Sequence, residues 1–517
     1  MQTARPFLTR LARDVTGNTL ALAAAAIVPF AILVGSGVDF GVAYMARGKL
    51  QNACDAGVLA ARQAMDGTNF TTAVEEEAER FFEFNFPKGT VGATDLEFEV
   101  DQDDADDTQL IGTASASIPT SLMRIAGINE LPISVQCDAK RDMGHNDILL
   151  VLDVTGSMAD APSNGGGTKI GRLRDGAAGI FRGLESDDGS IIRFGIVPYS
   201  HTVNVARSLR NHHILVQQPY VRRWREEQCE WKKDWRGNWY QSCNDVWMTG
   251  TKTVHIKDSS WSTKGDNIAA KIKKFRESGW GCIEERPSVG NSLSPYQINS
   301  TISRADIDSM APTTSLDEAG NTFIQSPLQF GRYDPNVQEG ESQDGCPAEA
   351  TPLQTYDDED DFQEAIDDAT SRVTGGTYHD VGMLWATRFI SRTGLFSATN
   401  PTERDGVPVN QHIVFMTDGM LDTGDTLYSA HGIERFQSRT QGGGTQDERH
   451  LARFASACAL ARSMGITVWV IALDVANTSN VKSCATSNEH FYTSDGSDLE
   501  EVFEEIGRGI GNLRLTR

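Results

Sequence analysis

The stretch DILLVLDVTGSM, residues 147–158, places a short polar loop directly after a continuous apolar run. A continuous apolar run of this length is typical of a strand that is buried on both faces of a parallel sheet. Ligands of such sheets bind at the carboxyl ends of the strands. The residues that follow the run, from Asp153 to Ser157, are therefore the first candidates for a binding site.

Strands of the same type recur along the chain and alternate with helical patterns. Further apolar runs are IIRFGIVPYS from Ile191, HIVFMTDG at 412–419 and TVWVIALD at 467–474. Helical periodicity marks KIGRLRDGAAGIFRGL at 169–184 and ERHLARFASACALARSMG at 448–465. This alternation predicts an α/β fold with a doubly wound parallel sheet.

Oxygen-bearing side chains gather at the predicted strand ends. The first loop carries Asp153, Thr155 and Ser157, the strand HIVFMTDG ends at Asp418, and Thr377 precedes a helical stretch. The arrangement resembles the metal-ion-dependent adhesion site of von Willebrand factor A (vWA) domains, with D-x-S-x-S on one loop, a threonine on a second and an aspartate on a third. The resemblance implies a vWA-type sheet with the metal ligands Asp153, Thr155, Ser157, Thr377 and Asp418.

The chemistry of these side chains suits Mg²⁺ (or Mn²⁺). Magnesium is a hard cation that prefers oxygen ligands in an octahedron and keeps water molecules readily. Neutral hydroxyl ligands leave the ion electrophilic, so that an open position accepts a carboxylate from another protein. Thr155 replaces the usual serine of the motif and keeps the hydroxyl. We therefore predict cation-dependent binding of a protein partner that offers an acidic side chain.

Two classes of enzyme place an aspartate in a similar setting, and this chain departs from both. Haloacid dehalogenase folds that transfer phosphoryl groups need a second aspartate two residues after the first, where this chain has Thr155. Aspartic proteases use D-T-G or D-S-G, but Val154 separates Asp153 from Thr155. The glycine clusters at 165–167 and 442–444 lack the Lys-Ser/Thr of a P-loop. No metal-binding spacing is visible for His201, His212, His213, His379 and His450. We predict that the protein is not an enzyme.

One apolar segment near the N-terminus is long enough to cross a bilayer. Residues 15–38 carry no charge, and residues 20–34 are densely apolar; about 20 apolar residues span the hydrocarbon core. Three arginines precede the segment and Asp39 follows it, so the positive-inside rule places the N-terminus in the cytoplasm and the rest outside. A cleaved signal peptide is the alternative. The helical pattern continues to Met65, which favours one long helix that starts in the membrane and ends outside it.

This segment resembles the N-terminal part of TadG-like proteins of the tight-adherence (Flp) pilus system. The resemblance rests on Gly17-Asn18 before the apolar run, on the Val38-Asp39-Phe40-Gly41 exit and on the small-residue helix that follows. It implies a single-pass protein of the bacterial inner membrane, with its bulk in the periplasm or at the cell surface, that works with Tad pilus components. Related pseudopilins carry an early glutamate in the apolar segment. This chain has none, which argues against prepilin-type processing.

Residues 66–143 are predicted to form a small α+β region of pilin-like type. A helical stretch breaks at 87–89, and apolar residues then alternate along 96–100, as in a strand. Two further strand patterns follow. Packing of the long N-terminal helix on this sheet would bring Cys54 near Cys137.

Charge and cysteine content limit the partners and the compartment. The net charge is −24, from 47 Lys and Arg against 71 Asp and Glu. Such a chain repels phosphate backbones, so nucleic acid is not an expected partner. The eight cysteines include no CxxC, which argues against a zinc ribbon or a thioredoxin-like site.

In an oxidising compartment the cysteines would form up to four disulfides. Proximity and order favour Cys229–Cys243, Cys282–Cys346 and Cys458–Cys484, although sequence alone does not fix the pairing. Eight buried free thiols in a cytosolic protein are the alternative interpretation.

The vWA-type domain is interrupted by an insertion at about 201–368. The insertion holds seven of the nine tryptophans, namely Trp224, Trp231, Trp235, Trp239, Trp247, Trp261 and Trp280. Exposed aromatic residues would form a protein or glycan contact surface, because aromatics dominate interface hot spots. We favour the other interpretation, in which they form the core of a small subdomain.

The predicted organisation has three parts. Residues 1–65 hold the cytoplasmic tip, the transmembrane helix and its extension, residues 66–143 the α+β region, and residues 144–517 the vWA domain with its insertion. The predicted function is cation-dependent protein binding in Flp/Tad-type pilus assembly by a membrane-anchored extracytoplasmic vWA protein. Two alternatives stay open: a surface adhesin that uses the tryptophan-rich insertion, and an envelope scaffold with a degenerate metal site.

Overall fold

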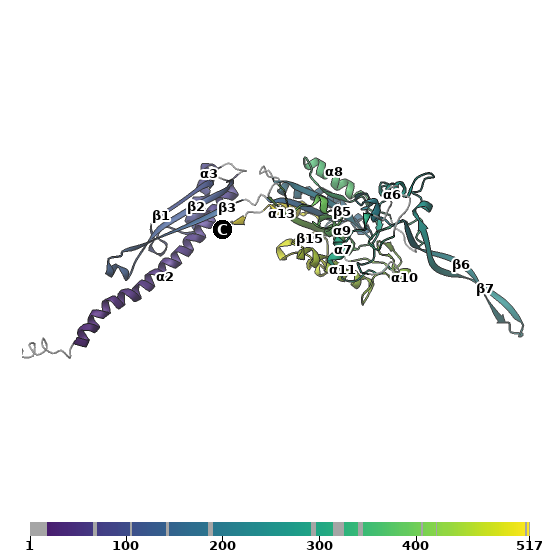
Figure 1. Cartoon of the computed structure of the whole chain (residues 1–517), viewed down its shortest axis with the longest axis horizontal. Coiled ribbons are helices and arrows are strands. Elements are labelled where there is room, and N and C mark those ends of the chain that lie inside the picture. The colour runs from purple at the N-terminus through teal and green to yellow at the C-terminus, as the bar shows by residue number, and fades with distance from the viewer. Residues whose placement is uncertain are drawn as a thin grey trace, which may run out of the picture. The chain divides into compact units, whose positions relative to one another are not determined.

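The chain folds into two compact units (Figure 1). The structure, a computed structural model, describes residues 18–65, 70–103, 106–140, 144–184, 190–290, 296–313, 325–339, 345–404, 407–419, 421–511 and 514–515. The described residues of the first unit are 18–140 together with 514–515, and those of the second are 144–511. Each unit has its own hydrophobic core.

The first unit packs one long helix against an antiparallel sheet. Its helices are α2 (Asn18–Ala64) and α3 (Thr72–Asn85), and its strands are β1 (Thr94–Asp103), β2 (Asp106–Pro119), β3 (Glu130–Lys140) and β17 (Arg514–Leu515), in the order β1-β2-β3-β17. Leu50, Ala53 and Val58 of α2 are fully buried in the core that the helix shares with the sheet. The disulfide Cys54–Cys137 ties α2 to β3. The predicted α+β arrangement is therefore present.

Two of the predicted domain boundaries differ from those in the structure. Residues 1–65 and 66–143 are not separate parts, because the buried face of α2 finds its partner only in the sheet that follows. Residues 514–515 lie in the predicted 144–517 domain, yet they pair with β3 of the first unit. A two-residue strand carries no alternating pattern that the sequence could reveal.

The N-terminal half of α2 presents an apolar surface. Large exposed side chains there are Ile27, Phe30, Leu33, Val34 and Val38. By length and composition alone, the helix from Ala25 to Ala64 is suited to crossing a membrane. The exposed stretch reaches Asp39, whose carboxylate accepts backbone hydrogen bonds from Ser121, Leu122 and Met123 at 2.7–2.9 Å. Asp39 thereby fixes the helix to the loop that follows β2.

The second unit is built on a sheet with the strand order β10-β5-β4-β12-β15-β16. The strands are β4 (His145–Asp153), β5 (Ile192–Tyr199), β10 (Thr351–Gln354), β12 (Val407–Thr417), β15 (Thr467–Leu473) and β16 (Phe491–Ser494), with β11 (Glu403–Arg404) beside β12. Neighbours along this order are parallel except β10 and β5. The chain order reverses between β4 and β12, so the sheet is doubly wound, as predicted.

Helices cover both faces of this sheet. One face carries α4 (Lys169–Ala177), α5 (Gly179–Leu184), α8 (Glu359–Ala369) and α13 (Leu499–Ile510), and the other carries α9 (His379–Ile390) and α11 (Gln446–Ser463). β4 is buried along its whole length. Leu150 and Leu152 point into the core beneath α4, α5, α8 and α13, whereas Leu149 and Val151 point into the core beneath α9 and α11. Burial on both faces explains why this strand reads as one continuous apolar run.

The insertion lies between β5 and β10. β10 forms the antiparallel edge of the main sheet and α8 covers its face, so the insertion occupies about 200–350 rather than the predicted 201–368. Its elements are β6 (Gln217–Lys233), β7 (Trp239–His255), β8 (Ile283–Glu284), β9 (Gly331–Arg332), α6 (Ile268–Arg276) and α7 (Arg304–Asp308). Short elements elsewhere are β13 (Tyr428–Ser429), β14 (Gly432–Ile433), α10 (Glu434–Gln437) and α12 (Ser479–Lys482).

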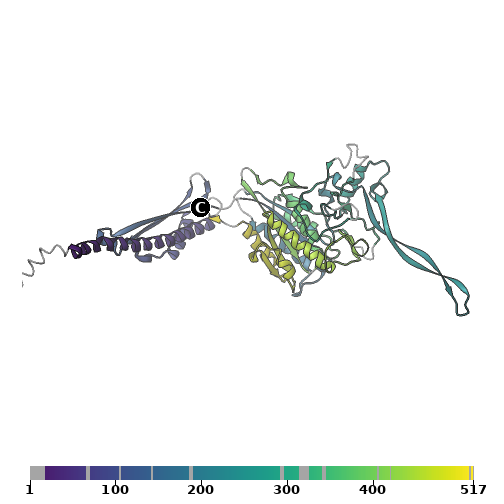
Figure 2. The same cartoon turned by 60° about the horizontal axis from the view of Figure 1, so that its bottom comes forward.

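The strands β6 and β7 form a long hairpin, called the arm (residues 217–255), that projects from the second unit (Figure 2). Its outer part is exposed on both faces. Five tryptophans of the arm have side chains that are between 37% and 86% exposed: Trp224, Trp231, Trp235, Trp239 and Trp247. Trp261, in contrast, packs against Phe275 of the core. The predicted tryptophan core is therefore wrong for these five residues, because a two-stranded ribbon has no further layer that would cover them.

The eight cysteines form four disulfides. The pairs are Cys54–Cys137, Cys229–Cys243, Cys282–Cys346 and Cys458–Cys484. These are the predicted pairs, and Cys229 and Cys243 occupy directly opposite positions on the arm. Complete pairing suits an oxidising compartment rather than the alternative of free thiols.

Glycines allow α5 and α13 to pack at backbone distance. A Cβ at Gly183 would overlap the carbonyl oxygen of Glu504 and lie 3.0 Å from Cα of Gly507. We expect Gly183→Ala to lower the free energy of unfolding by about 2 kcal/mol, because extra atoms in a tight contact cost this much. Thermal unfolding of the full chain measures the effect. The control is Gly443→Ala, whose added Cβ meets no atom within 4 Å, and equal melting temperatures for both variants would contradict the close packing.

Candidate metal site

Two loops and a strand end meet at the carboxyl edge of the main sheet. β4 runs into a 3-10 turn at Gly156–Ala159, and β12 pairs with β4 up to this edge. Backbone hydrogen bonds from Thr374 to Val154 (2.9 Å) and from Gly156 to Gly375 (3.0 Å) attach the loop that precedes α9. This edge lies at the reversal of the strand order, where doubly wound sheets bind their ligands.

Hydrogen bonds connect four of the five predicted residues. Ser157 Oγ donates to Asp418 Oδ1 at 2.8 Å and lies 3.1 Å from Thr155 Oγ1. The backbone N–H of Thr155 donates to Asp153 Oδ1 at 2.9 Å. These groups form one continuous chain across the ends of β4 and β12.

Thr377 is held at this edge by the backbone of the loop that follows β12. It exchanges two backbone hydrogen bonds with Asp422, of 3.0 and 3.2 Å, and its side chain is buried. Among the residues that the structure describes, none hydrogen-bonds to its hydroxyl. Both the lone pairs and the proton of the Thr377 hydroxyl are therefore available to a ligand.

Asp153 is the most confined carboxylate of the site. It is fully buried, and its Oδ2 accepts hydrogen bonds from Thr417 Oγ1 at 2.8 Å and from the Tyr199 hydroxyl at 3.3 Å. Burial, and next the negative charge of Asp418, raise the pKa of Asp153 to about 6. His379 Nε2 lies 3.0 Å from Thr417 Oγ1 and orients that hydroxyl toward Asp153. The charged form of Asp153 is thus costly in the metal-free protein.

Lys169 supplies positive charge beside the carboxylates of Asp418 and Asp474. Its Nζ lies 3.1 Å from Asp418 Oδ2 and 3.9 Å from Asp474 Oδ2. Asp474 follows β15, and its Oδ2 accepts a hydrogen bond from the backbone of Ser163 at 3.0 Å. Three neighbouring strands therefore deliver carboxylates to one edge of the sheet, and the ammonium group of Lys169 bridges two of them.

The insertion supports the loop that carries Thr377. Gly375 has a φ of +75°, and a Cβ at this position would overlap the ring of His201. His201 Nε2 lies 3.0 Å from the hydroxyl of Tyr333, and the Tyr333 ring stacks on Tyr428 with centroids 4.1 Å apart. A glycine at 375 is therefore required for the contact between this loop and the insertion.

The donor set fits a hard divalent cation. The predicted ligands offer carboxylate and hydroxyl oxygens, which Mg²⁺ and Mn²⁺ prefer over the nitrogen and sulfur ligands that softer metals take. Asp153 and Asp418 concentrate negative charge in buried surroundings, and a cation relieves their repulsion. These residues therefore fit Mg²⁺ or Mn²⁺.

Sequence reasoning missed three residues of the site: Lys169, Thr417 and Asp474. Thr417 and Asp474 carried a usable signal, because each lies at the end of an apolar run that predicts a strand. Lys169 carried none, since its ammonium group reaches Asp418 only after the helix α4 has packed on the sheet.

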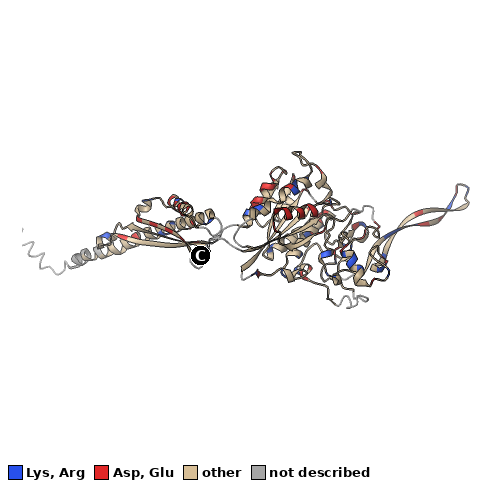
Figure 3. Cartoon of the chain, turned by 90° about the horizontal axis from the view of Figure 1, so that it is seen from above, with Lys and Arg blue, Asp and Glu red and all other residues tan. Residues whose placement is uncertain are grey.

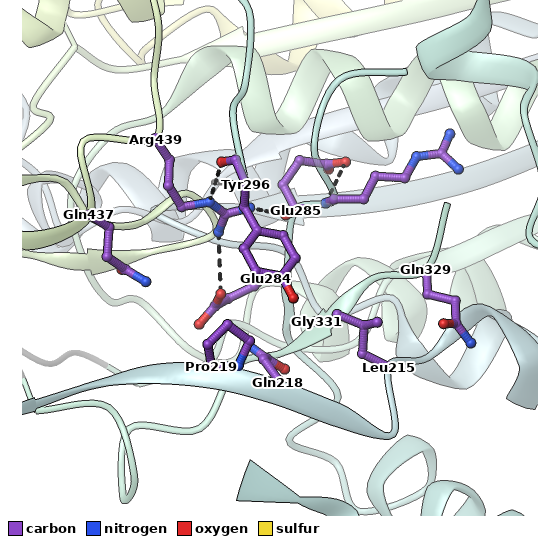
Figure 4. A pocket seen from close by; sticks show the side chains of 11 residues that line it. Leu215, Gln218, Pro219, Glu284, Glu285, Tyr296, Gln329, Gly331, Gln437 and Arg439 are labelled. Carbon is purple, nitrogen blue, oxygen red and sulfur yellow. Dashed lines mark hydrogen bonds and ion pairs between the residues drawn. The ribbon is translucent and has the colours of Figure 1, made fainter. Parts of the chain in front are cut away.

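A cavity elsewhere in the second unit is lined by the start of the arm, by β8 and by the loop after α10 (Figure 4). Both of its carboxylates are paired with neighbouring side chains. Tyr428 donates to Glu284 at 2.6 Å, and Arg439 lies 3.3 Å from the same carboxylate. Arg388 donates two hydrogen bonds to Glu285, of 2.8 and 2.9 Å. Mutual pairing of this kind marks a buried polar contact between the insertion and the core rather than a binding site.

Residues 17–66 match the Tad family model, which describes Flp pilus-assembly TadE/G-like proteins. The match covers the whole of α2 and confirms the resemblance that the apolar run and its exit indicate. No curated protein matches the chain.

Several solved structures resemble the chain at low scores. The von Willebrand factor domain of the type V pili tip protein Mfa5 from Porphyromonas gingivalis is 11% identical, with a TM-score of 0.30 over 71% of this chain and 95% of that one. Proximal thread matrix protein 1 from the mussel byssus, with a zinc-occupied MIDAS motif, is 11% identical (TM-score 0.30; 73% and 48% covered). The pilus adhesin SpaC from Lactobacillus rhamnosus GG is 12% identical (TM-score 0.33; 80% and 34% covered). The chain thus spans half or less of the last two. The main sheet itself, rather than these scores, shows a doubly wound α/β fold with an antiparallel edge strand, in agreement with the predicted fold class.

Removal of the Lys169 charge should destabilise the metal-free protein. We expect Lys169→Met to lower the free energy of unfolding by about 3 kcal/mol in the presence of a chelator, because it leaves the buried Asp418 carboxylate without its cation. Mg²⁺ should then stabilise the variant more than the wild type, since the ion no longer competes with an ammonium group. Thermal unfolding of the detergent-solubilised chain measures both effects. Lys273→Met, at a position 63% exposed, is the control. An equal Mg²⁺ response in variant and wild type would refute the competition.

Proposed function

We propose that the chain is a membrane-anchored vWA protein that binds a protein partner through a divalent cation during Flp/Tad-type pilus assembly. The ion, Mg²⁺ or Mn²⁺, would be held by Asp153, Thr155, Ser157, Thr377 and Asp418. The observation that carries the proposal is the series of hydrogen bonds that links Asp153, Thr155, Ser157 and Asp418 where the strand order of the sheet reverses.

Each side chain has a distinct part in this binding. The hydroxyls of Thr155, Ser157 and Thr377 are neutral ligands, so they preserve the charge of the ion. Asp153 and Asp418 balance part of that charge, and Thr417 keeps Asp153 oriented through its 2.8 Å hydrogen bond. A bound divalent cation would supply the positive centre that an acidic side chain of the partner completes.

The proposed location is the bacterial inner membrane, with one crossing and the bulk of the chain in the periplasm or at the cell surface. The match of residues 17–66 to a pilus-assembly family, the apolar helix and the four disulfides support it. Tad pilus components are the proposed partners. We propose no catalytic role, because Thr155 occupies the position where a phosphoryl-transferring enzyme of this type needs its second carboxylate.

Calorimetry with Mg²⁺ and Mn²⁺ on the detergent-solubilised full chain tests the metal site. We expect saturable binding that weakens at least about tenfold in Asp153→Asn and Asp418→Asn, since loss of even an outer-shell partner costs that much. Asp360→Asn, on the exposed surface of α8, is the matched control. No binding by the well-folded wild type would reject the proposal and favour the alternative of an envelope scaffold with a degenerate metal site.

The arm favours a second candidate function, that of an adhesin. Exposed tryptophans gather near its tip, with Trp231 65%, Trp235 86% and Trp239 61% exposed. Basic side chains lie over two of these rings, Lys233 over Trp239 and Arg236 over Trp235, at 4.7 and 4.5 Å from the ring centroids.

The arm also differs in charge from the rest of the chain. It carries seven Lys and Arg against five Asp and Glu, a balance of +2 in a protein of net charge −24. Figure 3 shows both signs spread along the hairpin, whereas all the charged residues of α8 are acidic. Exposed aromatics beside cations suit glycans or acidic protein surfaces.

Substitution of the three tip tryptophans separates the two functions. We expect the triple variant Trp231→Ala, Trp235→Ala, Trp239→Ala to reduce adhesion of Flp-piliated cells by about tenfold or more, because aromatic hot spots dominate contact energies. Its melting temperature and its Mg²⁺ affinity should not change, since the removed rings are exposed. Trp280→Ala, which removes a tryptophan 46% exposed outside the arm, is the control. Undiminished adhesion of the triple variant would exclude the arm as the contact surface.

A further inference from the structure

A second group of potential metal ligands lies buried in the second unit. It consists of Asp380 on α9, His450 on α11 and His431 in the turn between β13 and β14. One ligand atom from each side chain lies within 4.8 Å of the other two. All three residues are at most 2% exposed. Three segments that are distant in sequence therefore bring two imidazoles and one carboxylate to a single buried point.

The imidazole nitrogens of this group have too few hydrogen-bond partners. His450 Nδ1 donates to Asp380 Oδ1 at 3.0 Å, whereas its Nε2 has no partner in the part of the chain that the structure describes. Neither ring nitrogen of His431 is hydrogen-bonded to a described residue, and its Nε2 lies 3.7 Å from Asp380 Oδ2. A buried polar atom without a partner costs about 1–3 kcal/mol. A cation held between His450 Nδ1, Asp380 and His431 would give the Nε2 of His431 the partner that it lacks.

The separations suit a first-row transition metal. Two ligand atoms at about 2.0–2.1 Å from a tetrahedral ion lie roughly 3.3 Å apart. His450 Nδ1 lies 3.0 Å from Asp380 Oδ1 and His431 Nε2 lies 3.7 Å from Asp380 Oδ2, so one carboxylate oxygen faces each imidazole at a separation close to this value. Two imidazoles and one carboxylate are also a ligand set that Zn²⁺ accepts, with a fourth position for water.

The protonation states favour metal binding. Burial lowers the pKa of His431 well below its ordinary value, and the neutral imidazole is the form that binds metals. Burial opposes ionisation of Asp380, but its interaction with His450 and the positive charge of Arg453 hold its pKa far below the usual range. Arg453 Nε donates to Asp380 Oδ2 at 2.9 Å and thus orients the carboxylate as outer-shell partners of metal ligands do.

A hydrogen-bonded structural cluster is the alternative explanation. It accounts for Asp380, His450 and Arg453, which pair directly. It does not account for His431, which is buried beside His450, with ring centroids 4.8 Å apart, and donates no hydrogen bond to either neighbour. A third ligand for a shared ion gives His431 a reason to lie there.

We propose that Asp380, His431 and His450 bind a zinc ion that joins α9, α11 and the β13–β14 turn. This site is independent of the cation site at Asp153 and differs from it in chemistry, with nitrogen ligands in place of hydroxyls. The zinc ion stabilises the start of α9, which follows the loop of Thr377 in the chain.

The test uses the detergent-solubilised full chain, stripped with chelator and dialysed against Zn²⁺. Elemental analysis should find about one tightly held Zn²⁺ per chain. His431→Ala and His450→Gln should each lower zinc affinity at least about tenfold. His490→Ala, outside the cluster, is the control. Asp153→Asn should keep this zinc, and that result distinguishes the two sites even if the proposed Mg²⁺ site fails.

A second readout needs no variant. Co²⁺ bound in place of Zn²⁺ should give the intense visible absorption of a four-coordinate site with nitrogen ligands, and Zn²⁺ should displace it. Absence of that absorption, or equal zinc content in wild type and in a folded His431→Ala variant with its disulfides intact, would overturn the proposal.

Discussion

Two carboxylates at the ends of paired strands impose the constraint that organises the site. β4 and β12 run in parallel with Leu152 opposite Met416, so Asp153 and Asp418 leave the sheet at the same edge and cannot separate. In buried surroundings like charges repel strongly, and burial together with Asp418 raises the pKa of Asp153 to about 6. The surrounding groups reduce this repulsion, because hydroxyls donate hydrogen bonds to both carboxylates and the ammonium group of Lys169 lies beside Asp418. An edge that collects negative charge in this way suits cations.

The insertion extends the second unit without disturbing this edge. It leaves the sheet after β5 and returns as the antiparallel edge strand β10, so the pairing of β4 with β12 is unaffected. One of its residues, Tyr333, nevertheless reaches His201, whose ring lies against Gly375. The insertion thus backs the loop that carries Thr377, and a structural change in the insertion has a direct route to the site. The arm, in contrast, presents its side chains to solvent.

The strands and the oxygen ligands were predictable because they leave a local sequence pattern. The exposure of the arm and the meeting of distant side chains leave no such pattern. β4 is recognisable because burial on both faces demands a continuous apolar run, and strand ends mark Asp153 and Asp418. The tryptophans were misinterpreted because such residues are usually buried, and no sequence pattern reveals that both faces of the arm meet solvent. The group at Asp380 escaped notice for a different reason: His431 and His450 share no spacing that a motif would capture.

The first unit is joined to the second unit at two points of the chain. The chain leaves this unit at the end of β3 and returns to pair with β3 as β17, through Arg514 and Leu515. Both connections to the second unit therefore attach to neighbouring strands of one sheet. A pull on the second unit would reach that sheet at two points, through the backbone of β3 and through the hydrogen bonds between β17 and β3. β3 is in turn joined to α2 by the disulfide Cys54–Cys137, and α2 continues into the apolar segment. The covalent path from the second unit to the apolar helix thus runs through β3 and its disulfide, and β17 adds a second, hydrogen-bonded attachment to the same strand.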